Sequence, residues 1–132
     1  MDYLSPRMTE AEVNQISMLG LAHIGDGVYE LLTRTRLCVE GHSAAGELHR
    51  LTVARVKAPA QAKAMEKLLP HLTEEELALY RRGRNAHVHG VPQGASVGEY
   101  HAATGLEALF GWLYLQGRQE RLNALFQAAM EG

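Results

Sequence analysis

Apolar residues recur at intervals of three and four along nearly the whole chain, which is the spacing of one face of an α-helix. The longest such run extends over residues 19–39, and another extends over residues 98–116. No segment alternates between apolar and polar residues as a half-buried strand would. The pattern therefore predicts an all-α fold with two long helices.

Capping signals indicate where shorter helices begin. Thr9 and Glu12 have the spacing of a capping box, in which each side chain satisfies a free amide at a helix start. Thr73 and Glu76 repeat that spacing. Ser43 is predicted to cap a further helix, because a serine oxygen can accept from the free amides of the first turn.

Glycines and prolines indicate where the helices end. Gly41 is a plausible left-handed stop, Gly117 ends the second long helix, and Pro59 forces a restart or a kink. Three breakers in five residues make residues 87–97 a predicted loop. The shorter predicted helices are a brief one after Thr9 and then residues 45–56, 60–69, 74–86 and 120–130.

Length and composition favour a single domain. The 132 residues, 46% of them hydrophobic, suit one compact unit that buries about two thirds of its unfolded surface. Residues 1–132 are thus predicted to form one domain with no appended nucleic-acid-binding module. Cys38 is the only cysteine, which excludes an internal disulfide and favours a reducing compartment. No stretch has the length of a membrane span, so we expect a cytoplasmic protein without a membrane partner.

Two carboxylates occupy positions on predicted helices where apolar residues would be expected. Asp26 lies within residues 19–39, flanked by Gly25 and Gly27, and Glu107 lies within residues 98–116. Each glycine costs about 1 kcal/mol relative to alanine, so a close helix approach would explain them. Two carboxylates on converging helices can hold a hard cation such as Mg²⁺. Alternatively, each is partly exposed or paired with an arginine.

Basic residues are concentrated in the middle of the chain. Eight of the thirteen lysines and arginines fall within residues 50–84, although the formal net charge is -2. Such side chains could line a phosphate backbone, and the alternative is an ordinary solvated helix face. The candidate residues for contacts to such a backbone are His49, Arg50, Lys57, Arg81, Arg82, Arg84 and Asn85.

Histidines suggest a weaker alternative, a zinc site. His87, His89 and His101 are the best local set among seven histidines. Their spacing fits no helical two-histidine motif, so zinc is disfavoured.

Two motifs and several shorter ones carry a resemblance to a known family. The segment Ile24-Gly25-Asp26-Gly27-Val28 resembles the signature of ribonuclease III, and the segment that begins at Glu107 and Ala108 resembles its second acidic motif. The match is closer to Mini-ribonuclease III, a short bacterial form that consists of the catalytic domain alone. Its other motifs follow in order as residues 73–76, 82–86, 103–104 and 121–122.

This resemblance implies a homodimeric, all-α ribonuclease III endonuclease domain that lacks a double-stranded RNA-binding domain. It implies Mg²⁺-dependent cleavage of double-stranded RNA, with Mn²⁺ as a substitute, that leaves 5′-phosphate and 3′-hydroxyl ends. Asp26 and Glu107 become the catalytic metal ligands. The implied substrate is precursor RNA of the large ribosomal subunit (23S), with a ribosomal protein as a candidate partner.

Departures from the larger enzymes concern the metal site. Ala22 and Thr104 stand where those enzymes place a glutamate and an aspartate, replacements that the short form shares. Fewer protein oxygens per metal imply weak metal binding without RNA. Gln93 stands where some relatives have lysine, which removes one loop cation. The competing hypotheses are a non-catalytic RNA-binding or ribosome-assembly module on the same scaffold, and a helical adaptor without an RNA role.

Overall fold

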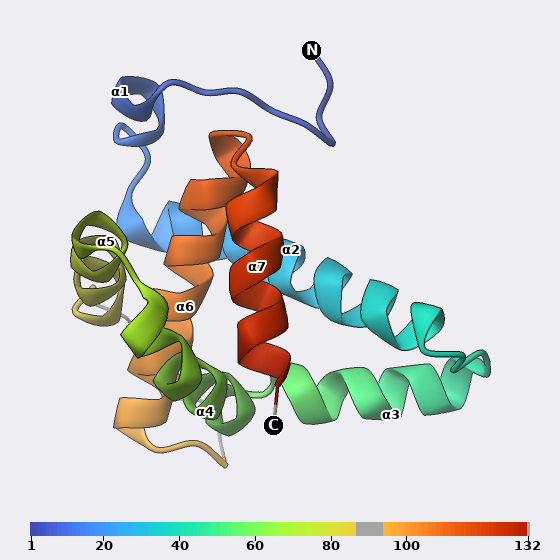
Figure 1. The fold of residues 1–132 in the computed structure, drawn as a ribbon. Coiled ribbons are helices and arrows are strands. Elements are labelled where there is room, and N and C mark those ends of the chain that lie inside the picture. The colour runs from blue at the N-terminus through green and yellow to red at the C-terminus, as the bar shows by residue number, and fades with distance from the viewer. Residues whose placement is uncertain (87–93, 132) are drawn as a thin grey trace.

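The computed structural model describes residues 1–86 and 94–131. Every element in these ranges is a helix, which confirms the all-α prediction (Figure 1). The elements are α1 (Glu10–Val13), α2 (Met18–Val39), α3 (Ala45–Val56), α4 (Ala58–Leu68), the 3₁₀ turn η1 (Leu69–His71), α5 (Glu74–Arg84), α6 (Val97–Leu115) and α7 (Gln119–Met130).

Helix α6 is the centre of the molecule, and helices α2, α4, α5 and α7 pack around it (Figure 1). Its side chains Leu106, Leu109, Phe110 and Leu113 are fully buried. The Tyr29 ring of α2 lies 5.3 Å from the Phe110 ring, so aromatic contacts join the two long helices. Burial on all sides explains why α6 is apolar around most of its circumference.

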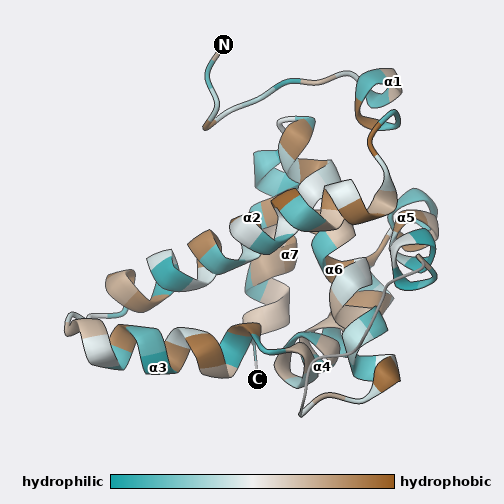
Figure 2. Cartoon of the chain, turned by 180° about the vertical axis from the view of Figure 1, so that it is seen from behind, coloured by the Kyte–Doolittle hydropathy of each residue, from teal (hydrophilic) through white to brown (hydrophobic). Residues whose placement is uncertain are grey.

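The C-terminal half of α2 and helix α3 form an arm that projects from this core (Figure 1). Figure 2 shows apolar residues along both helices of the arm. Several of them are exposed, including Leu31, Val39 and Val53. None of the helices in residues 1–86 and 94–131 combines the length and the apolarity needed to cross a membrane.

Most predicted helix boundaries are confirmed. Both predicted capping boxes form at α1 and α5, and Gly41 and Gly117 adopt positive φ angles of 104° and 75°. The chain restarts at Lys57, whose extended backbone ends α3 and begins α4, with Pro59 in the first turn of α4.

One helix start differs from the prediction. Ser43 does not cap α3, because the helix begins one residue later and its N-cap is Ala44, which has no side-chain acceptor. Helix α6 begins at Val97, in agreement with the predicted start near residue 98, and Ser96 and Glu99 form a third capping box there that was not predicted. Of the predicted loop, residues 87–93 lie outside the described residues.

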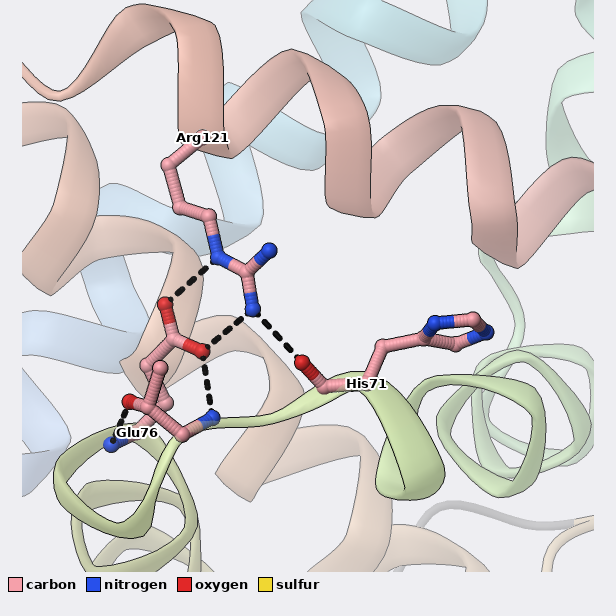
Figure 3. Close-up of polar contacts among 4 residues, drawn as sticks. His71, Glu76 and Arg121 are labelled. Carbon is pink, nitrogen blue, oxygen red and sulfur yellow. Dashed lines mark hydrogen bonds and ion pairs between the residues drawn. The ribbon is translucent and has the colours of Figure 1, made fainter.

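An ion pair between the buried Glu76 and the partly exposed Arg121 joins α5 to α7 (Figure 3). Arg121 donates two hydrogen bonds to the fully buried Glu76, at 2.7 and 2.8 Å, and a third to the His71 carbonyl at 2.7 Å. Burial raises the pKa of Glu76, but the bonds from Arg121 and from the Thr73 amide outweigh it and leave that pKa lowered. The capping glutamate of α5 therefore also fixes the position of α7.

Glycines allow α6 to approach its neighbours at backbone distance. A Cβ added at Gly25 of α2 would lie 1.6 Å from the Glu107 carbonyl oxygen, and one added at Gly111 of α6 would lie 2.1 Å from the Leu21 carbonyl oxygen. Gly83 and Gly105 form a similar close contact between α5 and α6. The sequence expectation of a close helix approach is confirmed for Gly25. It is wrong for Gly27, where an added Cβ meets nothing within 4 Å.

We predict that Gly25→Ala separates α2 from α6 and lowers the free energy of unfolding by more than about 3 kcal/mol, since a methyl group cannot share space with a backbone carbonyl. Gly46→Ala on α3 is the matched control, because an added Cβ there meets nothing within 4 Å. Urea unfolding of both variants measures the difference, and equal stabilities would contradict the account of the crossing.

Candidate active site

The crossing of α2 and α6 brings Asp26 and Glu107 together. Gly25, the neighbour of Asp26, contacts the backbone of Glu107 itself, and the two carboxyl groups lie within hydrogen-bond reach of each other. Asp26 is exposed, whereas Glu107 is partly buried. The expectation that both carboxylates replace buried apolar residues is thus wrong for Asp26: Gly25 faces α6, and the next position along α2 turns toward solvent.

Neither carboxylate has an arginine or lysine partner among the ion pairs of residues 1–86 and 94–131. Burial, followed by the hydrogen bond and the negative charge of Asp26, raises the pKa of Glu107 to about 8. A hydrogen bond from Gln61 opposes this rise. Glu107 thus keeps its proton at neutral pH, and a cation could replace that proton.

Two buried polar side chains surround Glu107. Gln61 of α4 is 1% exposed, and its amide nitrogen lies 3.0 Å from the Val56 carbonyl and 3.5 Å from the Glu107 carboxylate. Burial, together with the charge of Glu107, raises the pKa of Tyr29 to about 12. The Tyr29 hydroxyl and the Gln61 side-chain oxygen are both buried without a hydrogen-bond partner in the described part of the chain.

The residues at this pair fit a hard divalent cation. Two carboxylates without a cationic partner supply the oxygen ligands that Mg²⁺ prefers. Within the described part of the chain, no third histidine, cysteine or carboxylate joins them. Ala22 has no side-chain oxygen, and Thr104, whose hydroxyl donates a hydrogen bond to the Tyr100 carbonyl at 3.0 Å, supplies no carboxylate. A cation here would therefore depend on water and substrate oxygens for the rest of its shell.

A hollow of about 520 Å³ lies beside Glu107, between α4 and the N-terminal half of α6. Gln61, Lys57 and Tyr100 contribute its polar groups, and Ala58, Pro59 and Ala103 are among its apolar lining. Lys57 is the one candidate RNA-binding residue that shares this hollow with a candidate catalytic residue. Lys57 is exposed and thus adds positive charge to the hollow that Glu107 lines.

The other candidate RNA-binding residues are spread over α3 and α5. Arg50, Arg81 and Arg82 are exposed, and Asn85 is the C-cap of α5. The Arg84 guanidinium lies over the Tyr80 ring at 5.6 Å, which fixes its direction by a cation–π contact.

The histidines do not assemble a site within the described residues. His49 is exposed and lines a separate hollow beside Arg34 and Cys38. His87 and His89 lie outside the described residues, so the zinc alternative rests there on sequence alone.

One residue of the site was not singled out from the sequence. Gln61 lies on the stripe formed by Ala64, Met65 and Leu68, all of which are buried. A polar residue in such a stripe is the same kind of signal that marked Glu107, but the basic residues around it made α4 look like a solvated helix.

Comparisons with known proteins show which family this chain resembles. The ribonuclease III domain model matches residues 19–118. Mini-ribonuclease 3 of Symbiobacterium thermophilum is 48% identical over 113 residues, covering 86% of this chain and 87% of that protein. Mini-ribonuclease 3 of Thermoanaerobacter sp. is 41% identical over 124 residues, covering 94% and 87%. The crystal structure of a Fusobacterium nucleatum protein has a TM-score of 0.80 at 30% identity, covering 88% of this chain and 94% of that one.

The chain therefore belongs to the ribonuclease III family, and it is an endoribonuclease. Within that family its curated relatives at 35% to 48% identity are named Mini-ribonuclease 3, which confirms the resemblance inferred from its two acidic motifs.

We predict that Glu107→Gln stabilises the cation-free protein above pH 8, by about 2 kcal/mol after allowance for solvent. The pKa of Glu107 is about 8 in the folded state and 4.5 in the reference state, so the folded protein binds more protons between these values. Its free energy of unfolding thus falls as pH rises through this window. Urea unfolding in chelator at pH 5 to 9 measures this, and parallel profiles of the two proteins would contradict it.

Proposed function

We propose that the enzyme hydrolyses phosphodiester bonds of double-stranded RNA with the help of Mg²⁺ held by Asp26 and Glu107. The observation that carries this proposal is the pairing of two carboxylates, without a cationic partner in the described residues, at the backbone contact of α2 and α6. A structural carboxylate pair of this kind would destabilise the fold unless a ligand offset the repulsion.

The divalent cation would supply a nucleophile from bound water and stabilise the charge that develops on the phosphate. Asp26, which is exposed, can bind it from the solvent side, and Glu107 can bind it from the core side. Mn²⁺ can substitute, because it favours the same oxygen ligands. We propose weak cation binding without RNA, since neither Ala22 nor Thr104 adds a carboxylate to the site. The products would carry 5′-phosphate and 3′-hydroxyl ends.

Basic side chains of α3, α4 and α5 would hold the RNA. Lys57 lies closest to the proposed chemistry, because it lines the hollow beside Glu107. We propose that it binds a phosphate next to the scissile bond. The remaining contacts would come from His49, Arg50, Arg81, Arg82, Arg84 and Asn85, which would bind the sugar-phosphate backbone with little sequence preference.

We also propose that two copies form the functional unit. An apolar hollow of about 500 Å³ lies along α2, lined by Ile24, Val28, Leu31 and Leu32 together with Leu4 and Leu122. Leu31 is 58% exposed there. An exposed apolar surface of this kind is typical of a protein interface. A symmetric partner on this face would lie next to Asp26, so that two sites would face one RNA duplex.

For the natural substrate we propose precursor RNA of the large ribosomal subunit (23S) in the cytoplasm. The support is the family membership, since the curated relatives are named Mini-ribonuclease 3. A ribosomal protein bound to this RNA is a candidate partner.

We predict Mg²⁺-dependent cleavage of a long RNA duplex by the purified protein, and a loss of about 10³-fold or more in rate for Asp26→Asn and Glu107→Gln. Gel analysis of end-labelled RNA measures the rate and the end chemistry. The matched control is Glu30→Gln, which changes another carboxylate on α2 that pairs with Arg34. Intact RNA that is still bound in a gel shift would favour the ribosome-assembly module instead.

We predict that Leu31→Asp converts a dimer to a monomer, because a charge in an apolar interface is costly to bury. Light scattering at about 10 µM protein measures the mass, because a dimer with a submicromolar dissociation constant is almost fully formed at that concentration. A monomeric unmodified protein would contradict the proposed dimer. The control is Val39→Asp, which changes an exposed apolar residue at the far end of α2.

A further inference from the structure

Gln61 is a buried polar side chain with only part of its hydrogen bonding satisfied. It comes from α4, whose other buried residues are Ala64, Met65 and Leu68. Its amide nitrogen donates to the Val56 carbonyl at 3.0 Å and contacts the Glu107 carboxylate at 3.5 Å. Its oxygen has no partner among residues 1–86 and 94–131. An apolar side chain would fill this space without leaving an unpaired oxygen, so packing alone does not explain a glutamine.

The surroundings of Gln61 determine which way its amide points. Both groups at its nitrogen, the Val56 carbonyl and the Glu107 carboxylate, are hydrogen-bond acceptors. A flipped amide would point its oxygen at two acceptors, which is repulsive, so the nitrogen must face them. The Val56 carbonyl belongs to the last residue of α3, and Gln61 therefore connects the end of α3 to Glu107.

The contact affects Glu107 and not Asp26. The Glu107 side chain borders Asp26, the hollow that Lys57 lines, and Gln61. A donor on one oxygen restricts the rotation of the carboxylate without adding a negative charge to the pair. Preorganised ligands bind and act better than ligands that must first be ordered.

We propose that Gln61 is a positioning residue for Glu107, and that its amide, anchored on the Val56 carbonyl, holds the carboxylate beside Asp26 in the orientation that receives the cation. This inference rests on the proposed metal site. It assigns to a residue of α4 a part in a site otherwise made by α2 and α6.

The test uses the full-length protein with Gln61→Met, which keeps the volume and removes both polar atoms. Gln61→Asn keeps the amide but shortens its reach, and it serves if the methionine variant does not fold. The matched control is Gln116→Met. It removes a similar hydrogen bond, which the Gln116 side-chain amide donates to the Trp112 carbonyl at 3.0 Å, at the C-terminal end of α6. Three quantities are measured: the melting temperature, Mn²⁺ binding without RNA by the electron paramagnetic resonance of the free ion, and the kcat and KM for RNA cleavage.

We expect Gln61→Met to weaken Mn²⁺ binding by about threefold or more and to lower kcat by about tenfold, with the KM for RNA changed by less than about twofold. Its melting temperature should change little, since the removal of an unpaired buried oxygen offsets the loss of the hydrogen bond to the Val56 carbonyl. Gln116→Met should leave Mn²⁺ binding and kcat unchanged.

Unchanged Mn²⁺ binding and kcat in Gln61→Met would overturn the proposal. A lower melting temperature with normal activity per folded molecule would also overturn it, because that is the result expected of a purely structural role. These outcomes differ from the outcome expected if Asp26 and Glu107 do not bind a metal ion. In that case Glu107→Gln would bind Mn²⁺ and cleave RNA to the same extent as the unmodified protein. This result would overturn both the metal site and the positioning role of Gln61.

Discussion

The backbone contact between α2 and α6 is the constraint on which the rest of the structure depends. Gly25 and Gly111 let the two longest helices cross where any side chain would overlap a carbonyl oxygen. Because the contact at Gly25 is made to Glu107 itself, the same approach that completes the core also brings the two carboxylates together. Packing and chemistry therefore depend on one geometric feature, and a change that loosens the crossing should damage both.

The carboxylate pair of Asp26 and Glu107 lowers the stability of the fold that contains it. The ion pair of Glu76 and Arg121 shows how this protein satisfies a buried carboxylate when only structure is required, with a bidentate arginine and a backbone cap. Glu107 receives no such partner within the described residues, and its raised pKa reflects that difference. Active sites often retain such local strain because the ligand or substrate offsets it. The contrast between two glutamates of one small domain supports a functional reason for the second.

Local rules account for most of what the sequence predicted. The helices, two capping boxes and the glycine stops follow from interactions within a few residues, and the structure has them. The prediction that Ser43 caps α3 is wrong because the N-cap is the next residue, Ala44, and hydrophobic periodicity does not resolve a shift of one position. The Ser96 capping box was missed because the neighbouring glycines and proline indicated a loop.

The features that could not be predicted from the sequence depend on contacts between residues far apart in the chain. Gly25 and Gly27 look alike in the sequence, but only Gly25 faces α6, and this depends on where another helix lies. For the same reason Asp26 is exposed although its helix is largely buried. Gln61 reaches Glu107 from 46 positions away in the chain, so no local pattern could connect them. The motifs suggested the carboxylate pair, but the contribution of Gln61 depends on how α2, α4 and α6 pack together, and only the structure shows that packing.

Anomalous scattering from crystals soaked in Mn²⁺ would test the central claim most directly, because it locates the ion without reference to activity. The account predicts a peak between Asp26 and Glu107, with a carboxylate oxygen of each residue at about 2.0–2.3 Å and waters completing the shell. A peak bound by other residues, or none at this crossing at saturating Mn²⁺, would contradict the claim that α2 and α6 build a cation site.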